Sequence, residues 1–77
     1  MGEVVFVTRV GCSLCAEAQP VVERLTREAD VPLRVADVDA DPGLAEWSDH
    51  VPVVLLDGAV HSRWWVDEKV LRAALRG

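Results

Sequence analysis

Residues 3–15 read Glu3-Val4-Val5-Phe6-Val7-Thr8-Arg9-Val10-Gly11-Cys12-Ser13-Leu14-Cys15. Residues 3–8 are mostly β-branched or aromatic and are apolar on both faces, which is typical of a strand covered from both sides. Residues 9–11 then turn the chain, and a helical pattern begins at Ser13. The sequence therefore predicts that Cys12 lies at the turn between a buried strand and the start of a helix.

The remaining elements follow one another without linkers or repeats. Apolar periodicity predicts a helix over residues 13–29, whose buried stripe comprises Leu14, Ala18, Val21, Val22, Leu25 and Ala29. Further predicted elements are strands over 33–38, 51–56 and 59–64, a short helix over 44–47, and a last helix capped by Asp67. The order β-α-β-α-β-β-α predicts an α/β protein with a mixed four-stranded sheet and helices on both faces. Strands joined through helices should run parallel, and the Asp57-Gly58 hairpin should be antiparallel.

The composition is that of one globular domain over residues 1–77, with 51% hydrophobic and 27% charged residues. The formal net charge of -5 argues against nucleic acid and anionic membranes as partners, because both require a clustered basic surface. The sequence shows no targeting segment, and no apolar run approaches the ~20 residues that span a bilayer. We therefore expect a cytoplasmic monomer whose partners are proteins or small thiols.

Cys12 and Cys15 are separated by two residues. A disulfide between them would close a very short loop and remove little entropy from the unfolded chain, so its value is chemical rather than structural. Cys12 is close to the N-cap of the predicted helix, where unpaired N–H groups and the helix dipole favour a thiolate. Cys15 lies one turn further along and is placed to attack a mixed disulfide formed at Cys12. Arg9 adds a positive charge just before the pair.

Zinc sites also use the Cys-x-x-Cys spacing, so the motif alone leaves two kinds of site open. Its position after a strand and at the start of a helix favours a redox pair. His50 and His61 are the other candidate metal ligands, but they are too far apart in the chain to match zinc-finger histidines. Surface histidines explain them better, and the alternative for His50 is a charge partner of Cys12. We predict no metal and no other cofactor.

With these motifs the chain resembles a short glutaredoxin-like member of the thioredoxin superfamily over nearly its whole length. Cys12-Ser13-Leu14-Cys15 matches the dithiol motif of that superfamily, and Val51-Pro52 matches its cis-proline dipeptide. The resemblance implies a thioredoxin-like fold in which Val51 and Pro52 face Cys12 and position an extended substrate. Arg9 stands where glutaredoxins usually carry a lysine, and it is expected to contact the substrate.

The chain departs from that pattern near its terminal hairpin and beneath the dithiol. Glutaredoxins that bind glutathione carry a Gly-Gly pair after the hairpin, whereas this chain reads His61-Ser62-Arg63-Trp64-Trp65. The identity of any small-thiol co-substrate is therefore left open. The buried acid that thioredoxins place beneath the dithiol has no counterpart, because the corresponding strand carries Phe6. Trp64 and Trp65 are adjacent, so a strand would bury one and leave the other free to contact a partner.

The sequence thus predicts a dithiol–disulfide oxidoreductase in which Cys12 is the nucleophile and Cys15 resolves the mixed disulfide. Its substrate would be a disulfide in a protein or a small molecule, and a small thiol or a reductase would restore the dithiol. The alternative is a non-catalytic module on the same fold. Such a module would bind a metal or iron–sulfur cluster through Cys12, or dock a partner protein on its tryptophans.

Overall fold

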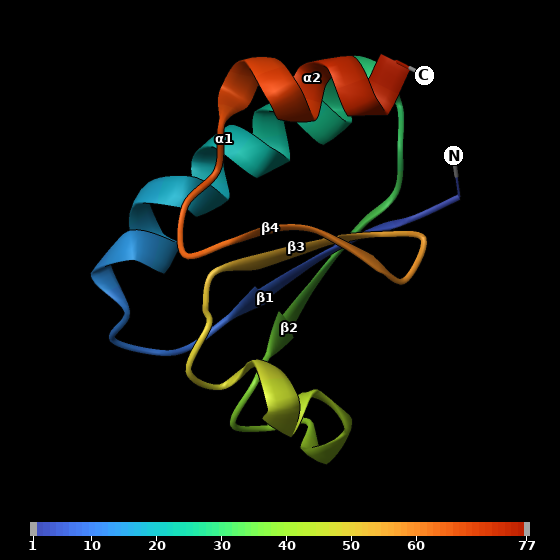
Figure 1. The fold of residues 1–77 in the computed structure, drawn as a ribbon. Coiled ribbons are helices and arrows are strands. Elements are labelled where there is room, and N and C mark those ends of the chain that lie inside the picture. The colour runs from blue at the N-terminus through green and yellow to red at the C-terminus, as the bar shows by residue number, and fades with distance from the viewer. Residues whose placement is uncertain (1, 77) are drawn as a thin grey trace.

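Seven elements follow one another in the predicted order in the computed structural model, which describes residues 2–76. They are β1 (Val4–Thr8), α1 (Ser13–Ala29), β2 (Leu33–Asp37), the 3-10 helix η1 (Pro42–Trp47), β3 (Val53–Leu56), β4 (Ala59–Arg63) and α2 (Glu68–Arg76) (Figure 1). The boundaries expected from the sequence lie within two residues of the observed ones. No helix in this part of the chain is long and apolar enough to cross a bilayer.

The four strands form one mixed sheet in the order β2-β1-β3-β4. β1 and β2 run parallel, as expected for strands joined through α1, and the β3–β4 hairpin is antiparallel. β3 is also antiparallel to β1, so the expectation of parallel pairing is wrong for this strand. The reason is the path of residues 38–52, which carry η1 past the end of β2 and enter β3 from that same end of the sheet (Figure 1).

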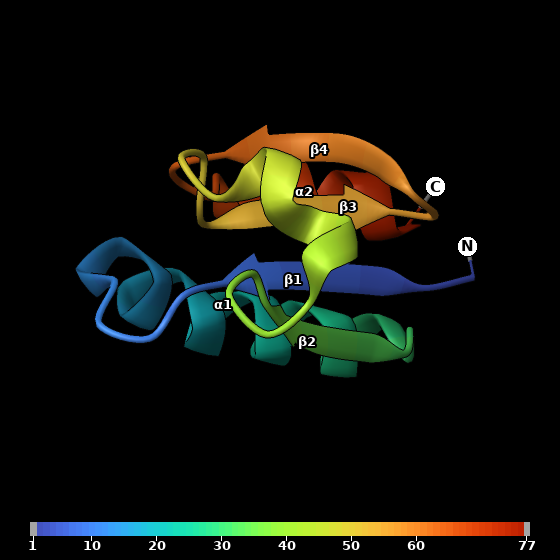
Figure 2. The same ribbon diagram turned by 90° about the horizontal axis from the view of Figure 1, so that it is seen from below.

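Helices cover both faces of the sheet, but unequally. α1 and α2 pack side by side on one face, and η1 crosses the other (Figure 2). Alternate residues of β1 point to opposite faces, so Val4 and Phe6 join the core beneath the α-helices while Val5 and Val7 join the smaller core beneath η1. β1 is therefore buried on both faces, as its unbroken apolar run predicts.

The buried stripe of α1 differs from the predicted one in its first turn. Ala18, Val22 and Leu25 are buried as expected, but Leu14 is 48% exposed while Cys15 is 2% exposed. Both sets of positions repeat every three or four residues, so periodicity could not distinguish them. The consequence is that one cysteine of the pair belongs to the hydrophobic core.

Turn and cap residues fix the ends of the elements in the second half of the chain. Asp57 and Gly58 adopt positive φ angles of 50° and 85°, as a two-residue hairpin turn requires. Asp67 caps α2, because its Oδ1 accepts a hydrogen bond from the Val70 N–H at 3.1 Å. Both features confirm the expectations from the sequence.

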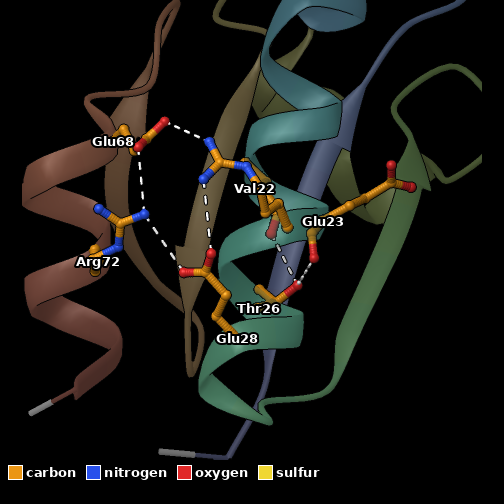
Figure 3. A network of polar contacts seen from close by, with 7 residues as sticks. Val22, Glu23, Thr26, Glu28, Glu68 and Arg72 are labelled. Carbon is orange, nitrogen blue, oxygen red and sulfur yellow. Dashed lines mark hydrogen bonds and ion pairs between the residues drawn. The ribbon is translucent and has the colours of Figure 1, made fainter.

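A ring of four charged side chains joins the two α-helices (Figure 3). Arg24 of α1 contacts Glu68 of α2 at 2.6 Å, and Arg72 of α2 contacts Glu28 of α1 at 3.5 Å. The pairs within each helix, Arg24–Glu28 at 3.8 Å and Glu68–Arg72 at 3.4 Å, close the ring. The ring therefore links the C-terminal helix to the helix that carries both cysteines.

Neutralising Glu68 is expected to weaken the attachment of α2 to α1. Hydrogen bonding to Arg24 lowers the pKa of Glu68 in the folded protein. A carboxylate whose folded pKa lies below its unfolded pKa stabilises the fold above the unfolded value, and this contribution is lost as the pH falls through the folded value. Glu68→Gln should therefore lower the melting temperature at neutral pH and have progressively less effect toward acidic pH.

The loss should be small because these pairs are solvent-exposed, and it should shrink in about 1 M salt, where the Debye length is about 3 Å. Glu17→Gln is the matched control, since Glu17 is exposed on α1 and has no ion pair among residues 2–76. Equal losses in the two variants, or a loss that salt does not change, would show that the ring has no specific effect.

Candidate functional site

Cys12 is the N-cap residue of α1, as the sequence predicts. Its backbone is extended, with φ -83° and ψ 112°, and its carbonyl accepts the first helical hydrogen bond, from the Ala16 N–H at 3.1 Å. Its Sγ accepts a hydrogen bond from the Cys15 N–H, also at 3.1 Å. The first turn of α1 contains no acidic side chain, so no carboxylate competes for the positive end of the helix. This geometry stabilises negative charge on the Cys12 sulfur.

Cys15 differs from Cys12 in its access to solvent. Cys12 is partly exposed, whereas Cys15 is buried in the core beneath the α-helices. Burial is the main reason that the pKa of the Cys15 thiol is raised, and the neighbouring Cys12 side chain raises it further. Both sulfurs are free thiols. The pair therefore combines an accessible sulfur at the helix N-cap with a buried sulfur whose raised pKa keeps it protonated at neutral pH.

A cavity of about 340 Å³ opens beside the two sulfurs, between the start of α1 and strand β2. Its walls include Thr8, Arg9, Cys12, Cys15, Gln19 and Asp37. Gly11 also lines it, and its φ of 84°, a conformation that favours glycine, lets the chain turn from β1 into the helix. The cavity provides room for part of a substrate next to the dithiol.

Arg9 lies in the wall of this cavity, where the sequence predicts a substrate-binding cation. Its guanidinium is already engaged, because Nε and one terminal nitrogen donate to the two carboxylate oxygens of Asp39 at 3.0 and 2.9 Å. The bidentate contact lowers the pKa of Asp39. Arg9 is therefore held near the cysteines as one half of an ion pair rather than as a free cation.

Val51 and Pro52 are joined by a cis peptide bond, as the resemblance implies. Pro52 is buried, and Val51 packs against the same core cluster as Cys12. Within residues 2–76, neither the N–H nor the C=O of Val51 has a backbone hydrogen-bond partner. The predicted dipeptide thus has free backbone groups at Val51 and shares a core cluster with Cys12.

Trp64 and Trp65 are both exposed, so the expectation that one of them lies in the core is wrong. β4 ends at Arg63, and Trp64 leaves the strand with a positive φ of 66°, which bulky residues rarely adopt. The two side chains, 49% and 65% exposed, line an apolar groove of about 160 Å³ together with Leu14. Trp47 of η1 supplies the core contact instead.

Trp64 holds the segment that contains the cis bond. Its backbone N–H donates to the carbonyl oxygens of Pro52 at 2.8 Å and His50 at 3.1 Å. Its indole N–H donates to the backbone carbonyl oxygen of Asp49 at 3.1 Å. Its ring also packs on His50, with 5.2 Å between the ring centroids. Sequence reasoning missed this role, because a pair of tryptophans after a strand carries no signal for a left-handed residue.

His50 belongs to an aromatic cluster with Trp47 and Trp64. Its Nδ1 is buried without a hydrogen-bond partner, and the same holds for Nδ1 of His61. Within residues 2–76, no group of three or more Cys, His, Asp or Glu side chains is placed to hold a metal ion.

Alkylation at neutral pH is expected to modify Cys12 and to spare Cys15. Iodoacetamide reacts with thiolates that it can reach, whereas Cys15 is buried and its raised pKa keeps it protonated. Peptide mass analysis after a short exposure should find the label on Cys12 in the folded protein and on both cysteines after denaturation. Equal labelling of the two cysteines in the folded protein would contradict the asymmetry of the pair.

The fold and the site together define a protein of the thioredoxin superfamily. The structure of thioredoxin 1 from Thermosipho africanus is similar, with a TM-score of 0.67 and 18% sequence identity. The match covers 95% of this chain and 93% of the thioredoxin chain. The structure of a mutant thioredoxin from Halobacterium salinarum is also similar, with a TM-score of 0.70 and 26% sequence identity. The match covers 95% of this chain and 70% of that thioredoxin chain. The expected thioredoxin-like fold is confirmed.

The chain belongs to the glutaredoxin-like domain family (DUF836), whose model matches residues 3–76. Uncharacterized proteins of Mycobacterium tuberculosis and Mycobacterium bovis are each 43% identical to it over 77 residues. Those matches cover 92% of this chain and 79% of each relative.

Proposed function

We propose that this protein is a thiol–disulfide oxidoreductase that reduces disulfides through Cys12 and Cys15. The observation that carries the proposal is the asymmetry of the pair, in which Cys12 caps a helix and is accessible while Cys15 is buried and protonated. A nucleophile needs an accessible position at a helix N-terminus like that of Cys12. A resolving thiol acts only after the substrate is bound, so it tolerates a buried environment in which it is protonated. Membership of a glutaredoxin-like family supports the same assignment.

The reaction consists of two exchange steps. The Cys12 thiolate attacks one sulfur of the substrate R–S–S–R′, which forms Cys12–S–S–R and releases R′–S⁻ to take a proton from water. Cys15 then loses its proton and attacks the Cys12 sulfur, which forms the Cys12–Cys15 disulfide and releases R–S⁻. Two electrons pass from the protein to the substrate, so an external thiol or reductase must reduce the pair before the next turnover.

We propose that Val51 aligns the substrate. Its free N–H and C=O, next to Pro52, would pair with an extended peptide as an added strand. The apolar groove of Leu14, Trp64 and Trp65 begins in the first turn of α1 and offers a surface for side chains beside the reacting disulfide. These features favour a disulfide carried by a protein as the substrate, with a small molecule as the simpler alternative.

We place the reaction in the cytoplasm, with a monomeric protein and a small thiol or a reductase as the source of electrons. The chain has two cysteines only three positions apart, which is unlike the disulfide framework of small secreted domains. A net charge of -5 disfavours nucleic acids and anionic membranes as partners. Arg9 remains the candidate contact for a substrate or small thiol, provided that the ligand competes with Asp39 for its guanidinium.

A single-turnover experiment tests the proposal. Reduced protein is mixed with an excess of a peptide disulfide in the absence of other thiols, quenched with acid and analysed by mass. The expected result is one peptide disulfide consumed per protein and an intramolecular disulfide in the product. A folded protein that consumes no substrate would favour the alternative, a non-catalytic binding module on the same fold.

A further inference from the structure

The second exchange step requires Cys15 to give up a proton in an apolar environment. Its side chain shares a core cluster with Phe6, which is completely buried on the neighbouring strand. Thr26 is the only polar residue buried in the part of the chain that the structure describes. No buried carboxylate is therefore available there to assist the ionisation of Cys15, and another group must do so.

Thr8 is the polar side chain placed for this task. It lies two residues after Phe6 on β1, so its side chain faces the side of the sheet that α1 covers. It also lines the 340 Å³ cavity together with Cys15, which gives both side chains a connection to solvent. The Thr8 hydroxyl therefore faces the same cavity as the Cys15 thiol, and its presence lowers the pKa of that thiol, against the effect of burial.

Arg9 and Asp37 are the charged side chains that line this cavity, and each has another contact. Arg9 forms its bidentate pair with Asp39. Asp37, which stands opposite Thr8 in the parallel register, accepts a hydrogen bond from the Asp39 backbone N–H at 2.9 Å. The backbone of Arg9 also lowers the pKa of the resolving thiol. That contribution would persist in any side-chain variant, which leaves the Thr8 hydroxyl as the side-chain group to test.

We propose that the Thr8 hydroxyl is a further catalytic group, which stabilises the Cys15 thiolate during the resolving step. This inference rests on the proposed function. As the Cys15 proton leaves for water in the cavity, the Thr8 O–H donates to Sγ. The thiolate attacks the Cys12 sulfur, the bond from Cys12 to the substrate sulfur breaks, and the departing R–S⁻ takes up a proton. The products are the Cys12–Cys15 disulfide and R–SH, so the protein is oxidised and the substrate is reduced.

The test uses an aromatic disulfide, dithionitrobenzoate, whose thiolate is coloured and whose release is followed by stopped flow. The first release reports attack by Cys12, and the second reports resolution by Cys15. Thr8→Val removes the hydroxyl at nearly constant shape, and Thr8→Ser keeps it. Thr26→Val is the matched control, because it makes the same chemical change at a hydroxyl that bonds the backbone carbonyls of its own helix (Figure 3).

We expect Thr8→Val to slow the second release roughly tenfold or more, as for loss of a hydrogen bond to a charged group, and to move its pH midpoint upward. Thr8→Ser should restore most of the rate, and Thr26→Val should release both thiolates as the unmodified protein does. A second release in Thr8→Val that keeps its rate and pH profile, or a Thr8→Ser variant as slow as Thr8→Val, would overturn the proposal. Absence of the first release in the unmodified protein would instead refute the proposed function.

Discussion

Replacing Cys12 by serine is expected to reduce the rate of disulfide reduction to the uncatalysed background. The attacking sulfur is lost, and a serine hydroxyl is not ionised at neutral pH. Cys15 cannot replace it, because its thiol is buried and protonated. The rate is measured by turnover of a peptide disulfide with dithiothreitol as the reductant, after thermal unfolding has shown that the variant is folded.

Cys15→Ser is the matched variant, and its expected result is different. Attack by Cys12 is retained but the resolving step is blocked, so the protein should accumulate Cys12–S–S–R. Mass analysis without reducing agent should find one half of the substrate attached to each protein. Undiminished turnover in Cys12→Ser would contradict the role of the nucleophile. A Cys15→Ser variant that forms no adduct would contradict the role of the resolving cysteine.

Phe6→Ala is expected to cost about 3–5 kcal/mol of unfolding free energy, because it leaves a cavity in the core next to the dithiol. Phe6 is completely buried on the central strand β1 and contacts the core that both α-helices cover. A chain of 77 residues is stable by roughly 4–12 kcal/mol, so the variant should lose much of its stability. Urea denaturation followed by tryptophan fluorescence measures the change.

Two control variants distinguish the effect of a core cavity on stability from the effect of shortening any side chain. Phe6→Leu keeps most of the volume and should cost less than about 1.5 kcal/mol, while Val60→Ala truncates a residue that is exposed on β4. A second readout follows from the site, because a loosened core should make Cys15 accessible to iodoacetamide. A Phe6→Ala variant as stable as Val60→Ala would show that the core does not depend on this ring.

Much of the fold could be predicted because its signals are local. The apolar run of β1, the Asp57-Gly58 turn and the Asp67 cap each lie within a few residues of the structure they produce. The N-cap position of Cys12 follows from the same kind of signal, since a strand, a turn and a helical pattern meet there. The position of Cys12 was therefore readable from one short segment.

The rest depends on contacts between residues distant in the chain. Arg9 is paired with Asp39, thirty residues away, and no local pattern indicates that its charge is engaged. The direction of β3 depends on where residues 38–52 turn, and the exposure of Trp64 depends on a left-handed backbone held by neighbouring carbonyls. The burial of Cys15 was hidden by helical periodicity, which fits it and Leu14 equally well.

The reduction potential of the Cys12–Cys15 pair tests the central claim most directly. Protein equilibrated in graded dithiol–disulfide buffers is alkylated after an acid quench, and the blocked thiols are counted by mass. A working redox couple predicts one cooperative two-electron transition within roughly -270 to -120 mV, the range spanned by thioredoxin-fold proteins that exchange disulfides. A pair that stays reduced throughout that range, or that remains blocked to alkylation after denaturation, would contradict the account and leave a binding module on the same fold.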